Sequence, residues 1–460
     1  MYTRIPFSLA LSAEISIRRD YCIIVDRKKQ KCTAIHPSEA FIVSLLDTRI
    51  TKAKLMEIFS GTYDIPPENA LNIINGVIEK LTTYLCAGAG SGPGQRRYQP
   101  ETFIYPGFSE LPGITAPMDT PMHLTLILGN RCNFNCIYCY ADLSSPSLSL
   151  SGSEAVGLID DAAEIGVVSV CLTGGEPLLH PEIDKIVAAA TGRGMLVVLA
   201  TNASLLDERM ADRLLGAGLK SIQVSLDAPS ASLHHFMTGS KNTFDRVVAG
   251  IRTLKARGFR VAVRSVAMLH NWNAMPDLID VMCGLNVDQI AVTTQVSCSG
   301  NCNGAKASLL GKMELDFLKE TIGAKRTEYP GCEMSFIQGD LEWRVREDII
   351  PCGGPMSTLV VHPSGEVTIC EMMGDDPEIS IGNIRNSGIE AVWLGQRHLS
   401  LLKKITNAEV VDPVCTRCES LAHCRTGCYN LSKIVYGDYY RKDPRCPGAE
   451  GLKWAGTPDF

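Results

Sequence analysis

The residues of this sequence best suited to chemistry are its cysteines. There are 18 of them among 460 residues, and ten fall into two regularly spaced groups. We find no export signal in the sequence, and the cytosol keeps thiols reduced, so cysteines at such spacing predict metal ligands rather than disulfides. Three others are possible distant metal ligands or free thiols: Cys298, Cys302 and Cys332. The remaining five are predicted to be small core residues: Cys22, Cys32, Cys86, Cys171 and Cys283.

The first group, Cys132, Cys136 and Cys139, has the spacing C-x3-C-x2-C. Three thiolates on one short loop can hold three irons of a [4Fe–4S] cluster and leave the fourth iron without a protein ligand. An open metal position is a place where a cofactor or substrate can bind. A zinc site with a distant fourth ligand would use the same spacing, so the three cysteines alone leave that alternative open.

The elements that must position this loop alternate between strands and helices. Strand-like apolar runs are separated by helical stretches, which predicts parallel βαβ units with right-handed crossovers. Six such units fit a partial (β/α)6 barrel, whose chemistry lies at the C-terminal ends of the strands. The cysteine loop follows the first strand. The predicted strands are 124–128, 167–172, 196–200, 221–226, 260–266 and 289–293, and the helices include 154–164, 183–191, 209–215 and 245–255.

The end of the second strand adds a further motif. It runs into Thr173-Gly174-Gly175-Glu176-Pro177, and an aromatic residue, Tyr138, precedes the third cysteine. With these motifs, residues 122–300 resemble the radical S-adenosylmethionine (SAM) superfamily, whose signature is C-x3-C-x-Φ-C followed by GGE. The resemblance implies that SAM binds the open iron. It also implies that one-electron cleavage of SAM gives a 5′-deoxyadenosyl radical, which takes a hydrogen atom from the substrate.

The same resemblance implies SAM contacts at the strand ends. Gly174 and Gly175 would let the backbone approach the methionine moiety, and Glu176 could accept from its ammonium group. Asn202 and Ser225 follow the third and fourth strands, although turn formation and helix capping explain such residues equally well. Tyr138 is a further predicted cofactor contact. Arg246 and Arg264 are both candidates for binding the SAM carboxylate, and the alternative for Arg246 is a solvent-exposed side chain.

The second cysteine group lies near the C-terminus. It reads C-x12-G-x4-C, then C-x2-C-x5-C-x3-C, then a last cysteine, and so resembles the seven-cysteine SPASM extension of radical SAM maturases. The resemblance implies two auxiliary [4Fe–4S] clusters. The first would use Cys352, Cys370 and Cys428, and the second Cys415, Cys418, Cys424 and Cys446.

Seven thiolates are one short of two complete ligand sets. Some relatives place a further cysteine where this chain has Thr358, so the first auxiliary cluster would have an open iron or a non-cysteine ligand. Glu371 follows Cys370 directly, and an acidic residue at this position acts as general base in sulfatase-maturing relatives. A surface glutamate is the alternative.

The chain divides into five predicted segments. Residues 1–90 contain three short strands and three helices, and resemble in layout the winged-helix-like domain with which peptide maturases bind a precursor's leader. An exposed strand edge can accept an extended peptide, although a packing domain or a DNA-binding fold has the same layout. The other segments are a linker (91–118), the barrel (119–310), a bridging region (311–350) and the SPASM domain (351–460).

Composition limits the partners. The net charge is −6, which argues against nucleic acid and anionic membranes, because both attract basic surfaces. No apolar run approaches the roughly 20 residues that span a bilayer. We therefore expect a cytoplasmic α/β enzyme without nucleic-acid or membrane partners.

The leading functional hypothesis is modification of a ribosomally synthesised precursor peptide. The resemblance implies three [4Fe–4S] clusters, SAM and an external electron donor such as flavodoxin or ferredoxin. Thioether formation from a peptide cysteine, as in sactipeptide and ranthipeptide maturases, is the favoured reaction. Carbon–carbon crosslinking, epimerisation, sulfatase maturation and tailoring of haem or another small molecule are alternatives, as is a non-enzymatic iron–sulfur scaffold.

Overall fold

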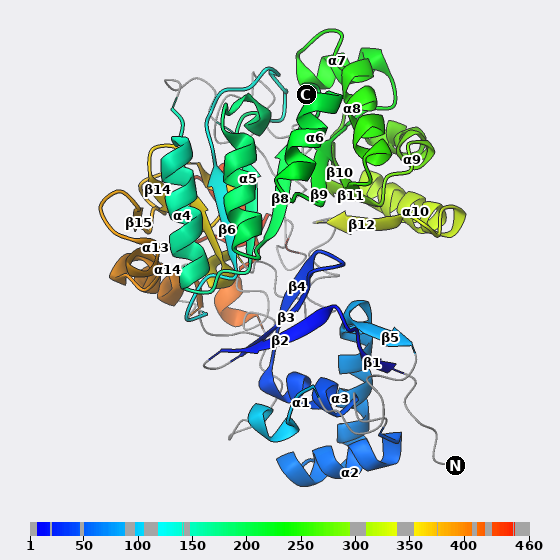
Figure 1. The fold of residues 1–460 in the computed structure, drawn as a ribbon, viewed down its shortest axis with the longest axis vertical. Coiled ribbons are helices and arrows are strands. Elements are labelled where there is room, and N and C mark those ends of the chain that lie inside the picture. Colours follow the sequence, from blue (N-terminus) through cyan, green and yellow to red (C-terminus); the bar gives the residue numbers. More distant parts are fainter. Residues whose placement is uncertain are drawn as a thin grey trace. The chain divides into compact units, whose positions relative to one another are not determined.

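The structure is a computed structural model that divides into two compact units, Met1–Asp119 and Thr120–Phe460 (Figure 1). It describes residues 7–18, 21–46, 50–87, 97–104, 118–139, 141, 148–294, 310–337, 354–374, 376–406, 412–418, 426–444 and 446. The predicted ligands Cys352 and Cys424 lie outside these residues, as do Cys298, Cys302 and parts of the predicted linker and bridging region.

Unit 1 has the predicted three strands and three helices. β2 (Ala13–Ile17), β3 (Cys22–Asp26) and β4 (Lys31–Ile35) form an antiparallel sheet in that order. The helices α1 (Pro37–Leu46), α2 (Lys52–Tyr63) and α3 (Pro67–Lys80) follow. The third helix ends at Lys80, and β5 (Leu85–Ala87) then pairs with β1 (Phe7–Leu9).

Part of the predicted linker belongs to unit 1. Residues 97–104 include a short 3-10 helix, Pro100–Phe103, and Phe103 is buried in the core of this unit. Tyr98 packs against the same core, and its hydroxyl accepts the Ile15 N–H at 2.8 Å. The glycine content suggested a linker, but these two aromatic rings bury enough apolar surface to hold the segment in place.

Unit 2 contains the predicted parallel barrel sheet. Its six strands pair in sequence order and are separated by helices, as Figure 1 shows. The strands are β6 (His123–Ile127), β7 (Ser169–Thr173), β8 (Leu196–Thr201), β9 (Ser221–Ser225), β10 (Arg260–Ala267) and β11 (Gln289–Thr294). The helices are α4 (Gly152–Glu164), α5 (Ile183–Gly192), α6 (Glu208–Gly216), α7 (Ala231–Thr238), α8 (Phe244–Ala256) and α9 (Met275–Gly284).

Strands from outside the predicted barrel extend this sheet at both ends. In the predicted bridging region, α10 (Lys312–Glu328) leads to β12 (Glu333–Ile337), which pairs with β11 in parallel. At the other end, β13 (Thr358–Val361) pairs with β6 in parallel, and β14 (Glu366–Thr368) and β15 (Gly382–Asn383) continue antiparallel. The C-terminal domain and the barrel therefore share one sheet.

The C-terminal region also contains short helices. They are α12 (Gly354–Ser357), α13 (Ile389–Trp393), α14 (Gln396–Thr406) and α16 (Tyr429–Tyr436). Trp393 and Tyr429 are buried in the same apolar core as the barrel strands. No helix in the described part of the chain is both long and apolar enough to cross a bilayer.

The two faces of the barrel strands differ in burial. In β10, Val261, Val263 and Ser265 are at most 1% exposed, whereas the alternating Arg264 is only partly buried. In β7, Val170 and Leu172 are buried and Cys171 between them is partly exposed. Because side chains alternate along a strand, one face packs under the helices and the other lines the barrel lumen.

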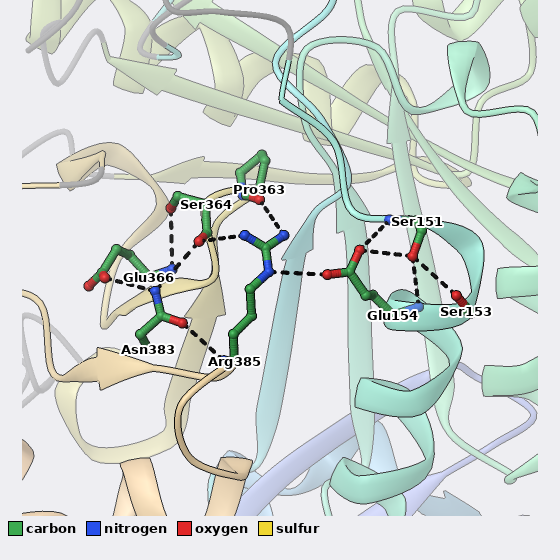
Figure 2. Close-up of polar contacts among 8 residues, drawn as sticks. All are labelled: Ser151, Ser153, Glu154, Pro363, Ser364, Glu366, Asn383 and Arg385. Carbon is green, nitrogen blue, oxygen red and sulfur yellow. Dashed lines mark hydrogen bonds and ion pairs between the residues drawn. The ribbon is translucent and has the colours of Figure 1, made fainter.

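A polar contact also connects the two domains of unit 2 (Figure 2). The Arg385 guanidinium, just after β15, donates from Nε to Glu154 at the start of α4 over 3.1 Å. It also donates to the carbonyls of Ser364 and Pro363 at 2.8 and 3.1 Å. Glu154 in turn forms a capping box with Ser151. The contact is partly exposed, so it contributes less than ~1 kcal/mol of stability.

Candidate active site

The first cysteine group lies on the loop after β6. Cys132, Cys136 and Cys139 are all partly buried. Burial raises the pKa of Cys132 to about 11, with Glu176 and Cys139 nearby adding to it, and burial also raises the pKa of the other two thiols. A metal ligand is the thiolate, so iron binding at this loop would release the protons that these thiols hold. Three neighbouring thiols at one strand end fit a cluster with an open iron.

Neighbouring elements hold this loop on two sides. The backbone N–H groups of Asn135 and Ile137 donate to the carbonyls of Thr238 and Met237 at the end of α7, at 2.9 and 3.0 Å. On the other side, the Asn202 amide donates to the side-chain oxygen of Asn133 at 2.9 Å. Sequence reasoning did not find Asn133, Met237 or Thr238, and backbone carbonyl acceptors leave no signal in residue types.

The two glycines after β7 pack directly against the same loop. The Gly175 N–H donates to the Gly129 carbonyl at 2.8 Å. A Cβ atom on Gly175 would lie 2.2 Å from the Arg131 carbonyl oxygen, and one on Gly174 would lie 2.5 Å from that of Gly129. Gly174 also has a φ of +151°, which favours glycine. Glycine is therefore required at these two positions because the backbone packs against the cysteine loop. Sequence analysis had instead expected the glycines to make room for SAM.

Glu176 connects the ends of two strands. It is 3% exposed, and its carboxylate accepts from the Thr201 hydroxyl at 2.6 Å and from the N–H groups of Asn202 and Leu178 at 2.8 and 3.0 Å. Burial raises its pKa, and these three donors oppose the shift. Three protein donors occupy most of the carboxylate's acceptor sites, so its first role is to fix β8 beside β7.

Tyr138 is also engaged within the protein. Its hydroxyl donates to Asp227, which is buried just beyond β9 and accepts the Val266 N–H at 2.8 Å. Burial raises the pKa of Asp227 to about 6. Ser225, the last residue of β9, is partly exposed, as its predicted place at a strand end requires.

The two candidate arginines differ in position. Arg246 is exposed on α8, whereas Arg264 lies on the lumen face of β10, in register with Ser225. The guanidinium of Arg264 is therefore the better placed for a ligand inside the barrel. Sequence analysis left a solvated Arg246 as the alternative, and the exposed position of this residue on α8 agrees with that alternative.

Glu371 is partly buried rather than a surface residue. It starts a 3-10 helix, Glu371–Met373, after β14. Burial raises its pKa, and the positive charges of Arg264 and His362 oppose this effect. The carboxylate in turn raises the pKa of Cys171, so the three groups lie near one another. Cys171 is therefore a lumen residue, which corrects its interpretation as a core residue.

Of the second cysteine group, five members are described. Cys415, Cys418 and Cys446 are neighbours: burial raises the pKa of Cys415 to about 11, and the other two thiols add to it. These three belong to the ligand set proposed for the second auxiliary cluster. Cys370 and Cys428 are partly buried, and the Cys428 N–H donates to Asp443, whose carbonyl accepts the Cys446 N–H. Cys332, a possible distant ligand, instead forms a thiol contact with Cys283.

Family models match both cysteine groups. The radical SAM superfamily model matches residues 126–282, and the iron–sulfur cluster-binding SPASM model matches residues 352–419. The chain is a radical SAM enzyme with a SPASM domain. Radical SAM enzymes use an iron–sulfur cluster and SAM, and the first cysteine loop fits this cofactor set. The match favours an iron–sulfur cluster over zinc for that loop.

Several proteins resemble this radical SAM enzyme over most of its length. The AdoMet-dependent heme synthase of Methanosarcina barkeri is 26% identical over 74% of this chain and 99% of its own. The PqqA peptide cyclase of Gluconobacter oxydans is 24% identical, with coverage of 71% and 90%.

Solved structures share the fold. Streptococcus suis SuiB bound to its precursor peptide SuiA has a TM-score of 0.65 at 14% identity, with coverage of 96% of this chain and 100% of SuiB. AdoMet-bound anSMEcpe has a TM-score of 0.57 at 16% identity, with coverage of 71% and 94%.

Proposed function

We propose that this radical SAM enzyme modifies a ribosomally synthesised precursor peptide and forms a cysteine thioether crosslink. The observation that carries the proposal is unit 1. The M. barkeri heme synthase matches 74% of this chain, which leaves a portion the size of unit 1, Met1–Asp119, unmatched. The SuiB fold covers 96% of the chain and so extends into unit 1, and that structure contains a precursor peptide.

Unit 1 offers a strand edge for such a peptide. The sheet order makes β4 an edge strand. The Ile15 N–H points away from β3, since it donates to Tyr98. Ile15 and the opposite Ile24 therefore form a non-hydrogen-bonded pair. Hydrogen-bonded and non-hydrogen-bonded pairs alternate in an antiparallel ladder, so the backbone groups of Ile24 face β4 and bond to Thr33. The backbone groups of the next residue, Ala34, therefore face outward, where an extended leader can pair with them.

Within unit 2, we propose that Cys132, Cys136 and Cys139 hold the cluster that cleaves SAM. When bound, the cluster and SAM supply a 5′-deoxyadenosyl radical that removes a hydrogen atom from a substrate carbon. The C-terminal cysteines would hold two auxiliary clusters. The contacts of Asn202, Gly175 and the end of α7 fix the cysteine loop at the lumen mouth, which orients the reaction.

Forming a thioether removes one hydrogen atom from carbon and the hydrogen from the peptide thiol. The second hydrogen leaves as a proton and an electron. Glu371 supports this step because it is a partly buried carboxylate whose pKa Arg264 lowers and which itself raises the pKa of Cys171. We assign it the role of accepting that proton, and an iron–sulfur centre or external carrier takes the electron.

The test uses synthetic peptides encoded by short open reading frames beside the gene. With reduced, iron-loaded enzyme and SAM, we expect a cysteine-containing peptide to lose one pair of hydrogen atoms per crosslink, as mass spectrometry would detect. A Cys→Ser peptide should remain unmodified. Crosslinking of the serine peptide would overturn the thioether reaction, and loss of all peptide turnover would overturn the function.

The edge of β4 has its own test. Ala34→Pro removes the outward N–H and should weaken leader binding about tenfold, whereas Ala34→Val keeps the N–H and should bind normally. Fluorescence anisotropy with a labelled leader measures both. Equal affinities would show that the peptide does not pair with this strand.

A second candidate is tailoring of a haem precursor, which the likeness to the M. barkeri heme synthase favours. Turnover of an iron porphyrin by the enzyme, with no neighbouring peptide modified, would select this function. Deletion of residues 1–119 would then leave turnover of the porphyrin intact.

A further inference from the structure

The chain on either side of Cys428 carries two buried polar side chains that lack partners among the described residues. Thr426 lies two residues before this cysteine and Asn430 two residues after it, and each is 2% exposed. The Thr426 hydroxyl and the Asn430 side-chain nitrogen have no hydrogen-bond partner in the described part of the chain. A buried donor without an acceptor is costly, and native proteins rarely leave one. Both groups therefore predict that an acceptor binds beside Cys428.

The backbone at Thr426 is a second indication of function. Its φ is +68°, a left-handed conformation that a β-branched residue rarely adopts. Glycine would adopt the same conformation without strain. Strained residues cluster at functional sites, where the surrounding structure holds them in place. The feature that glycine would lack is the hydroxyl, which is the group without a partner.

The fold holds this segment in place through Asp443. The Asp443 N–H donates to the Thr426 carbonyl at 2.8 Å, and the Asp443 carboxylate accepts the Cys428 N–H at 2.8 Å. A Cβ atom on Gly427 would lie 2.4 Å from the Asp443 Cβ, so the backbone packs closely against this side chain. Cys428 is the N-cap of α16, and Asn430 is the second residue of that helix. The Cα atoms of both flanking residues therefore lie within about 7 Å of that of Cys428.

An iron–sulfur cluster bound by Cys428 would supply the missing acceptors. Leu431 packs against Cys428 and against Met372, which brings the segment that carries Cys370 to the same place. Both cysteines belong to the ligand set proposed for the first auxiliary cluster. The sulfur atoms of such a cluster accept hydrogen bonds. An amide and a hydroxyl beside Cys428 are therefore chemically suited to it.

We propose that Asn430 and Thr426 donate hydrogen bonds to sulfur atoms of the cluster bound at Cys428 and make that cluster easier to reduce. The inference rests on the proposed ligand set and adds two residues outside it. Reduction gives the cluster one more negative charge, and hydrogen-bond donors stabilise the more negative state. The midpoint potential is therefore more positive than it would be without them, which favours this cluster as the acceptor of the electron released in the proposed reaction.

The test measures the reduction of each cluster in the iron-loaded enzyme. Electron paramagnetic resonance during a redox titration gives the midpoint potentials, and the SAM-cleaving cluster is recognised because added SAM changes its signal. Asn430→Leu keeps the size of the side chain without its donors, and Thr426→Val keeps the branched shape without the hydroxyl. Val435→Ala, later in α16, is the control for a change in the same helix. Iron content and circular dichroism show whether each variant is folded, and Asn430→Ala replaces a leucine variant that has lost iron.

The variants should change one cluster and leave the others unaltered. In Asn430→Leu, its reduction equilibrium should shift about tenfold toward the oxidised form, which is about 59 mV for one electron. Thr426→Val should shift the same cluster in the same direction, and Val435→Ala should shift none. In D2O, pulsed resonance of the wild type should detect exchangeable deuterons coupled to that cluster, and Asn430→Leu should show fewer of them.

Unchanged potentials in both iron-loaded variants, or an equal shift in Val435→Ala, would overturn the inference alone. Cys428→Ala tests the ligand set on which the inference rests, because this variant should lose the signal of the cluster that shifts. If Cys428→Ala keeps the signals and the iron content of the wild type, the proposed ligand set fails and the inference falls with it.

Discussion

The two cysteine groups lie on different kinds of scaffold. The first is held by the ends of barrel strands and by α7, through backbone bonds of Asn135, Ile137 and Gly175. Of the second group, Cys428 and Cys446 lie beside the buried Asp443, and Cys415 lies beside the buried Asp412. Asp443 accepts the Cys428 N–H at 2.8 Å, and Asp412 accepts the Val414 N–H at 3.0 Å.

The two cysteine groups are therefore held in place by different interactions. Backbone hydrogen bonds with α7 and with the end of β7 hold the first loop, so we expect it to keep its geometry without metal. The described cysteines of the second group lie largely outside regular strands and long helices, so we expect bound clusters to contribute much of the stability of this region, as in small metal-binding domains. Three variants test whether the two cysteine groups differ in this way.

The largest effect is expected from replacing Cys132, Cys136 and Cys139 together by alanine. The triple variant should lose one cluster and all formation of 5′-deoxyadenosine, because these three thiols are the ligands proposed for the SAM-cleaving cluster. The unfolding free energy of the iron-free protein should fall by only about 1 kcal/mol per partly buried residue. Continued 5′-deoxyadenosine formation with dithionite would show that the radical cluster lies elsewhere.

A smaller effect is expected from Gly175→Ala. Its Cβ would meet the Arg131 carbonyl, which should displace the cysteine loop, destabilise the protein by about 1–3 kcal/mol and slow SAM cleavage about a hundredfold. Gly157→Ala, inside α4 with open space around it, is the matched control and should be neutral or slightly stabilising. Equal rates and melting temperatures for the two variants would contradict a sterically fixed loop.

The smallest effect on the reaction is expected from Asp443→Ala. It leaves the Cys428 N–H without its acceptor and should cost about 1–3 kcal/mol. Iron should be lost from the SPASM domain while SAM cleavage continues. Asp438→Ala, which removes the acceptor of the Tyr440 N–H, serves as control. Iron analysis and thermal unfolding would distinguish them, and full iron content in the Asp443 variant would show that the loops hold the clusters unaided.

Much of the fold followed from local patterns. Alternating strand and helix periods gave the six barrel strands, because these periods depend only on which side of each element is apolar. The same patterns missed the pairing of β12 and β13 with the barrel, since each strand is short and its partner lies far along the chain. They also assigned residues 97–104 to a linker, because two aromatic residues in a glycine-rich stretch carry little periodic signal.

Cysteine spacing and the GGE motif determined the radical SAM chemistry from the sequence alone, because ligands on one loop are fixed by covalent distance. Which other side chains lie near the predicted reaction site became known from the tertiary structure. It directed Arg246 to solvent and Arg264 into the lumen, and it brought Glu371 beside Cys171 across 200 residues of sequence. Strand register and helix rotation set these directions, and both depend on packing against the whole barrel rather than on neighbouring residues.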